Sequence, residues 1–167
     1  CSKLNWQLIL ITITQKSPEW KTKPWTPFFI PPASGKGTKH CSGPFDLHPG
    51  LKIMTFNIEG AKTNINYLKD LAKDPTLIIC LQEHWLWGFE KDFLQKHFPL
   101  HSFFIRSKDE NDPILNFKAP RGHAGTAIMW PQSFDNCIQK LPDGNDRIMA
   151  IKIELKNQNI CLINTYM

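Results

Sequence analysis

The chain has 167 residues, of which 41% are hydrophobic and 21% are charged, with a formal net charge of +5. This composition suits one globular domain with a hydrophobic core and argues against an intrinsically disordered chain. The positive charge favours an anionic partner such as nucleic acid, but it is unevenly distributed. Residues 1–50 contain six lysines against two acids, whereas residues 51–167 contain fourteen basic against thirteen acidic residues.

The cysteine pattern and the longest apolar run bear on the compartment. The five cysteines are odd in number and form no C-x-x-C pair, which argues against a disulfide framework and against a structural zinc site. We therefore expect a reducing, intracellular compartment. The uncharged run LILITIT near the amino terminus is too short to span a bilayer, so we expect no membrane segment.

Residues 1–48 are predicted to form an irregular leader rich in Pro, Lys and Trp. Seven of the thirteen prolines lie in residues 14–50. Proline lacks the backbone N–H that a helix interior or a central strand requires. We therefore expect the folded domain to occupy residues 49–167.

From residue 51 the sequence alternates between strand and helix patterns, which is typical of an α/β or α+β layered sandwich. LKIMTF predicts a strand buried on both faces, TNINYLKDLAK a helix that packs on the sheet, and TLIICLQ a second fully buried strand. A second helix is predicted near residues 89–97. Strands are predicted at HSFFIR, GTAIMW, RIMAIKIEL and ICLINTY, with a turn at Asp143–Gly144 before the third of these.

Polar side chains stand where the first two predicted strands end. Asn57 closes the first strand, and Glu83 follows the second. Because a helix joins these strands, we expect them to be parallel, with their carboxyl ends at one edge of the sheet. One carboxylate with amide and water oxygens is a typical ligand set for Mg²⁺. A solvated or helix-capping role for Glu83 is the alternative that this pair alone leaves open.

Five segments in order resemble the endonuclease/exonuclease/phosphatase family: FNIEG, LIICLQEHW, RGHAGTAIMW, DRIMAIKI and CLINTYM. QEHWL and RGHAG are most similar to the endonuclease domains of LINE-type retrotransposons. The resemblance covers residues 51–167 and implies the N-terminal half of a fold of two sheets flanked by helices. It also implies Mg²⁺-dependent hydrolysis of DNA in a parent protein that nicks its target site and carries a C-terminal reverse transcriptase domain. A nuclear location is consistent with such a parent.

The resemblance implies roles for individual residues. Asn57 is similar to the family's Asn that orients the metal and the phosphate, and Glu83 to its metal-binding Glu. Tyr166 is similar to the Tyr whose hydroxyl donates to the scissile phosphate; the alternative is a packed aromatic whose hydroxyl meets a backbone carbonyl. Glu59 stands where many relatives have Asp, so it either lies near the metal or is an exposed carboxylate.

Three basic side chains are further candidates for contact with the substrate. Arg147 matches a recurring Arg of the family and either contacts phosphate or forms an ion pair with Asp143 or Asp146. Arg121 and His123 lie on a glycine-containing loop. That loop either contacts the DNA backbone or is solvated.

Two later segments of the family do not occur in this sequence: a G-D-x-N segment that activates the attacking water, and an S-D-H segment with a closing His. Water activation and charge stabilisation must act on the same phosphate, so we expect this chain to be inactive alone. Two alternatives remain open. One is a phosphoesterase of the same fold acting on a phosphate outside nucleic acid, and the other is a non-catalytic relic with residual nucleic-acid binding.

Overall fold

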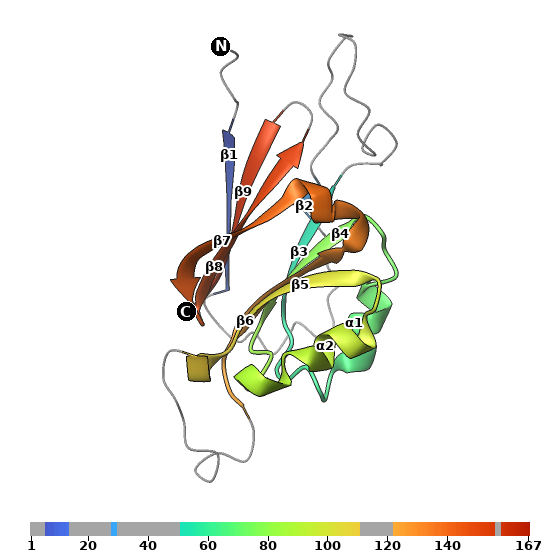
Figure 1. Cartoon of the computed structure of the whole chain (residues 1–167), viewed down its shortest axis with the longest axis vertical. Helices are drawn as coiled ribbons and strands as arrows, with labels where there is room; N and C mark the ends of the chain where they lie inside the picture. The colour runs from blue at the N-terminus through green and yellow to red at the C-terminus, as the bar shows by residue number, and fades with distance from the viewer. Residues whose placement is uncertain (1–5, 14–27, 30–50, 111–121, 156–157) are drawn as a thin grey trace.

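The computed structural model describes residues 6–13, 28–29, 51–110, 122–155 and 158–167 (Figure 1). One sheet contains β2 (Phe28–Phe29), β3 (Lys52–Asn57), β4 (Leu77–Gln82), β5 (His101–Arg106) and β6 (Thr126–Pro131). The other contains β1 (Trp6–Ile13), β7 (Ile138–Asn145), β8 (Ile148–Leu155) and β9 (Gln158–Tyr166). The helical elements are α1 (Ile65–Leu71), α2 (Asp92–His97) and the 3₁₀ turns η2 (Gly88–Glu90), η3 (Lys108–Glu110) and η5 (Gln132–Cys137).

The two sheets stack, and the two α-helices lie on the outer side of the larger one (Figure 1). The strand order is β2-β3-β4-β6-β5 in the larger sheet and β1-β9-β8-β7 in the smaller. β3 and β4 are parallel, with Lys52 opposite Leu77 and Asn57 opposite Gln82. The predicted crossover through α1 is therefore confirmed, and the chain has the α+β layered architecture that the sequence predicts.

Alternate side chains of β3 and β4 enter two different hydrophobic layers. Phe56 packs in one layer with Leu68 of α1 and Leu94 of α2. Cys80 packs in the other layer, between the sheets, with Leu162 of β9. Helices cover one face of the larger sheet and a sheet covers the other, which explains why these strands are continuously apolar in sequence.

Two strands lie in residues 1–48, where we predicted an irregular leader. β1 pairs in parallel with β9, from Trp6 opposite Asn159 to Ile13 opposite Tyr166, and β2 pairs antiparallel with β3. The run WQLILITI is rich in β-branched residues, which favour a strand once a sheet edge is within reach. The rest of this segment lies outside the described residues, so the domain boundary at residue 49 stays a prediction.

The sequence does not predict β7, and it places the neighbouring turn wrongly. Asp143–Gly144 is a turn signal, yet the strand continues through it with a register irregularity and with Gly144 at φ +110°. The chain turns after Asn145, whose Oδ1 accepts the backbone N–H of Arg147 at 2.9 Å. The turn signal thus marks an irregularity of the strand register, where glycine supplies the positive φ.

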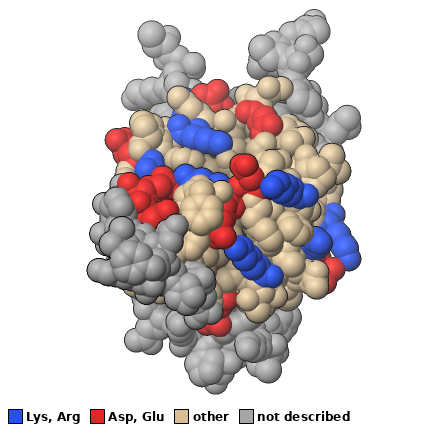
Figure 2. Space-filling model, turned by 60° about the horizontal axis from the view of Figure 1, so that its bottom comes forward, with Lys and Arg blue, Asp and Glu red and all other residues tan. Residues whose placement is uncertain are grey.

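The helices are short, and charges of both signs share one face of the molecule. α1 spans seven residues and α2 six. In the ranges that the structure describes, no helix has the length and apolar character needed to cross a membrane. On the face shown in Figure 2, Lys and Arg are interspersed with Asp and Glu. The net positive charge of the chain is therefore not concentrated there.

Candidate active site

The loops that follow β3 and β4 are joined beyond the edge of the sheet. The N–H of Ile58 donates to the carbonyl of Gln82 at 3.0 Å, and the N–H of Gly60 donates to the carbonyl of Glu83 at 2.8 Å. Asn57 therefore ends its strand beside the segment that carries Glu83. Glu83 is buried, with a relative exposure of 4%.

Tyr166 reaches this edge from the other sheet. Its hydroxyl donates a hydrogen bond to Oε1 of Glu83, 83 residues away in sequence. This bond is the largest cause that raises the pKa of Tyr166 to about 12, ahead of desolvation and the charge of Glu83, while nearby Arg147 lowers it. The hydroxyl therefore stays protonated at neutral pH and remains a donor. Its partner is a carboxylate, not the backbone carbonyl of the alternative interpretation.

Left-handed backbone conformations gather in the loops around Glu83. Among the residues that the structure describes, four non-glycine residues have φ between 46° and 55°: Glu59, Glu83, Trp85 and Ala124. Each such residue costs about 1 kcal/mol relative to an ordinary conformation. The Trp85 N–H donates to the carbonyl of Ala124 at 3.1 Å, so the loops support one another in these conformations.

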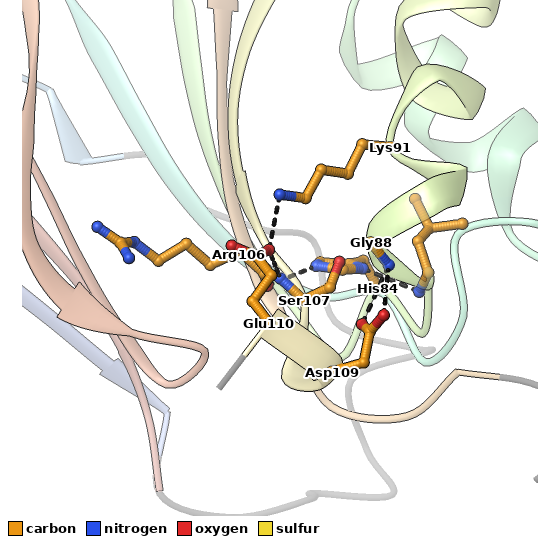
Figure 3. A network of polar contacts seen from close by, with 8 residues as sticks. His84, Gly88, Lys91, Arg106, Ser107, Asp109 and Glu110 are labelled. Atoms are coloured by element: carbon orange, nitrogen blue, oxygen red, sulfur yellow. Dashed lines mark hydrogen bonds and ion pairs between the residues drawn. The ribbon is translucent and has the colours of Figure 1, made fainter. Parts of the chain in front are cut away.

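His84 fixes the Glu83 loop to the end of β5 (Figure 3). The side chain is fully buried, and its Nδ1 accepts the N–H of Leu86 at 3.0 Å. Because Nδ1 is an acceptor, Nε2 carries the proton and donates to the carbonyl of Arg106 at 3.0 Å. Burial is the largest cause that lowers the pKa of His84 to about 4, so the ring is neutral.

Two carboxylates of η3 hold the continuation of the same loop (Figure 3). The N–H of Gly88 lies 3.0 Å from each oxygen of Asp109. Glu110 accepts the N–H of Ser107 at 2.6 Å and pairs with Lys91 at 2.7 Å. The sequence does not predict this network, because its members come from loops whose approach is set by the fold.

Residues 122–125, which belong to the RGHAG segment, pack against the Glu83 loop. A Cβ atom at Gly122 would lie 2.6 Å from the carbonyl oxygen of Trp85, and one at Gly125 would lie 2.5 Å from Nε2 of His84. These glycines are therefore needed for close approach. His123, between them, is exposed. Arg121, the other candidate from this segment, lies outside the described residues.

The remaining candidates lie beside the site. The N–H of Glu59 donates to Oδ1 of Asn57 at 3.1 Å, and the Glu59 side chain is half-buried. Arg147 is exposed, and its carbonyl accepts the N–H of Tyr166 at 2.9 Å. Among the described residues Arg147 forms no ion pair with the neighbouring aspartates, so that interpretation of Arg147 is not supported.

The oxygen atoms at this edge match the ligand preferences of Mg²⁺. They are the carboxylate of Glu83 and the amide oxygen of Asn57, which also accepts the backbone N–H of Glu59. No group of three His, Cys, Asp or Glu side chains suited to a metal is found in the described part of the chain. Mg²⁺ keeps several waters and needs only one or two carboxylates from the protein, so this set fits Mg²⁺.

Comparisons with known proteins support the fold. No family model matches the chain, and no curated protein sequence matches it. The AP endonuclease LMAP from Leishmania major is similar in structure, with a TM-score of 0.50 and 23% identity over 70% of this chain and 40% of that one. The 3′ phosphatase NExo from Neisseria, bound to a product DNA hairpin, has a TM-score of 0.40 and 17% identity over 66% of this chain and 40% of that one. The chain thus spans about two fifths of the length of either structure, and its likeness to the AP endonuclease confirms the predicted fold.

Proposed function

We propose that this chain is the amino-terminal part of a Mg²⁺-dependent endonuclease that hydrolyses a phosphodiester bond of DNA, of the kind that nicks the target site of a LINE-type retrotransposon. The observation that carries the proposal is the contact between the Tyr166 hydroxyl and the Glu83 carboxylate, which come from different sheets. Asn57 ends the strand next to the one that leads into Glu83. Three of the five family-like segments, FNIEG, LIICLQEHW and CLINTYM, supply the residues of the proposed site.

Each residue has a chemical role in this proposal. Glu83 and Asn57 would hold Mg²⁺, which would supply positive charge to the phosphoryl oxygens. Tyr166, whose hydroxyl donates to Glu83 in this structure, would donate to a phosphate oxygen when the substrate is bound. Glu59 orients Asn57, because its backbone N–H fixes the amide oxygen.

The proposed site lacks a group that activates water. The G-D-x-N and S-D-H segments of the family do not occur in the sequence. General-base catalysis typically contributes about 100- to 10,000-fold, so we infer that this chain cleaves DNA only together with further residues. In the parent protein these residues and a reverse transcriptase domain would complete the activity.

A supercoiled-plasmid nicking assay with Mg²⁺ tests the proposal. The proteins compared are this chain and the chain joined to the missing part of an AP endonuclease, each with and without Glu83→Gln. Each protein is also tested for hydrolysis of an inositol phosphate. We expect nicking only by the joined protein, and a loss of roughly 100-fold or more with Glu83→Gln because an amide lacks the negative charge that holds the metal. Glu154→Gln, which changes a carboxylate exposed on β8, is the matched control.

Three outcomes would contradict the proposal in different ways. Nicking by the chain alone that Glu83→Gln removes would show that the present residues suffice for catalysis. Nicking by the joined protein that survives Glu83→Gln would exclude Glu83 from the site. Hydrolysis of an inositol phosphate without nicking of DNA would favour the phosphoesterase alternative.

A further inference from the structure

A buried pair of amides joins the two sheets directly beneath the candidate site. Gln82 and Asn164 are both fully buried. Nε2 of Gln82 donates to Oδ1 of Asn164 at 2.6 Å and to Oγ1 of Thr55 at 2.9 Å. Nδ2 of Asn164 donates to the carbonyls of Leu81 at 3.0 Å and Ala127 at 3.1 Å. One side chain of β9 thereby contacts both β4 and β6.

The layer around this amide pair is apolar. Its members include Cys80, Ile128, Ile151 and Leu162. Apolar contacts hold the sheets together but specify their relative displacement weakly, whereas hydrogen bonds depend steeply on distance and angle. An amide in such a layer is costly unless its polar atoms are paired. Within the described part of the chain, Oε1 of Gln82 has no hydrogen-bond partner, so the hydrogen bonds of the pair offset this cost only in part.

The amide pair lies next to the two residues that meet at the site. Glu83 directly follows Gln82, and Tyr166 stands two residues beyond Asn164 on β9. Residues two apart in a strand point to the same face, so the Tyr166 and Asn164 side chains leave β9 on the same side. A displacement of β9 along β4 would therefore move the Tyr166 hydroxyl relative to the Glu83 carboxylate.

We propose that Gln82 and Asn164 are positioning residues, which fix the smaller sheet on the larger one so that Tyr166 and Glu83 meet. Asn164 sets the position of β9 through three hydrogen bonds to the larger sheet. Gln82 transmits that position to the strand end that carries Glu83. Their role in a catalytic centre rests on the proposed function, but their effect on the contact between Tyr166 and Glu83 does not.

A double-mutant cycle measures the effect without metal or DNA. Urea unfolding is measured for the chain, for Glu83→Ala, for Tyr166→Phe and for the double variant. The cycle is repeated in an Asn164→Leu background and in a Thr55→Val background. Thr55→Val is the matched control, because it removes a hydrogen bond of the same Gln82 within one sheet and leaves the contact between the sheets.

In the unsubstituted chain we expect the coupling between Glu83 and Tyr166 to change the unfolding equilibrium constant on the order of tenfold, as for hydrogen bonds to charged groups. The coupling should fall to near one with Asn164→Leu and persist with Thr55→Val. If Asn164 only stabilised the fold, Asn164→Leu would lower the stability and leave the coupling unchanged.

Gln82→Met repeats the test if Asn164→Leu does not fold, since it keeps the side-chain length and removes the amide. Coupling that persists in a folded Asn164→Leu or Gln82→Met chain would overturn the inference. The cycle and the nicking assay fail independently. If Asn164→Leu abolishes the coupling but the joined protein does not nick DNA, the positioning role is retained and the endonuclease proposal is rejected. If the coupling persists in Asn164→Leu but the joined protein nicks DNA, the endonuclease proposal is retained and the positioning role is rejected.

Discussion

His84 couples the candidate site to the rest of the chain at the scale of a single residue. Both of its ring nitrogens are used, one as acceptor from Leu86 and one as donor to Arg106. Protonation would place a second N–H at Nδ1, where the Leu86 N–H already points. The neutral ring is thus built into the loop that presents Glu83.

We predict that acid weakens the fold through His84. The pKa of His84 is lowered from 6.5 to about 4 in the folded chain, mainly by burial. Between pH 6.5 and pH 4 His84 is protonated in the unfolded chain but neutral in the folded chain. The stability contribution of the neutral ring is therefore complete above pH 6.5 and decreases as the pH falls towards 4. The loss should total roughly 3 kcal/mol. Urea unfolding at pH 7.5 and pH 5, with His84→Gln as control, measures it.

The comparison with His84→Gln isolates this histidine from other titrating groups. The difference in unfolding free energy between the two proteins should be smaller at pH 5 than at pH 7.5. Only the chain that contains His84 gains a proton at this position on unfolding at pH 5, and this lowers its stability. A difference that does not change with pH would show that His84 can be protonated in the folded state.

The sequence reveals some site residues and hides others for a physical reason. Asn57, Glu83 and Tyr166 stand where apolar runs end, so residue type and position point to a sheet edge. Gln82 and Asn164 stand at the same strand ends, but their polar character suggests exposure, and only the stacking of the sheets buries them. Long-range contacts of this kind leave no local pattern.

At the scale of elements, the site depends on loops that pack backbone against backbone. Gly125 has φ +84°, and a Cβ there would lie 2.5 Å from Nε2 of His84. The loop that contains Gly125 therefore approaches the His84 ring more closely than a side chain permits. Its neighbour Ala124 also has positive φ, at 53°, but it carries a Cβ.

We predict that Gly125→Ala destabilises the chain by about 2 kcal/mol or more, through backbone strain and the clash with His84. Ala124→Gly is the matched control, since it relieves a left-handed conformation and adds freedom to the unfolded chain, with a net change within about 1 kcal/mol. Thermal or urea unfolding distinguishes them. Equal stability of the two variants would show that the loop can move away from His84.

An element can be predicted from the sequence when the residues that determine it lie within the element itself. HSFFIR predicts β5 with the bounds His101–Arg106 that the structure has, because the apolar run and its polar flanks are local. β7 is not predicted because of Asp143–Gly144, whose turn signal marks a register irregularity within the strand. β1 is hidden because its partner, β9, lies at the far end of the sequence.

At the scale of the whole molecule, β1 covers an edge of the smaller sheet. It pairs with β9 from Asn159 to Tyr166, so the strand that carries Tyr166 has neighbours on both sides. The chain spans 40% of the similar AP endonuclease, and no further strand lies beside β1 in the described part. An uncovered edge strand presents unpaired N–H and C=O groups that can pair with another chain.

We predict that removing residues 1–13 destabilises the protein and promotes self-association of partly unfolded chains, because the ladder between β1 and β9 is lost and β9 replaces β1 as the edge strand. Removing residues 1–5 alone is the control, since it leaves β1 and its pairing intact. Sedimentation velocity over a range of protein concentrations should show larger species that grow with concentration for the first truncation but not for the second. The unfolding midpoint should also fall only in the first, because the ladder between β1 and β9 is lost. Indistinguishable sedimentation and stability of the two truncated proteins would show that β1 does not protect this edge.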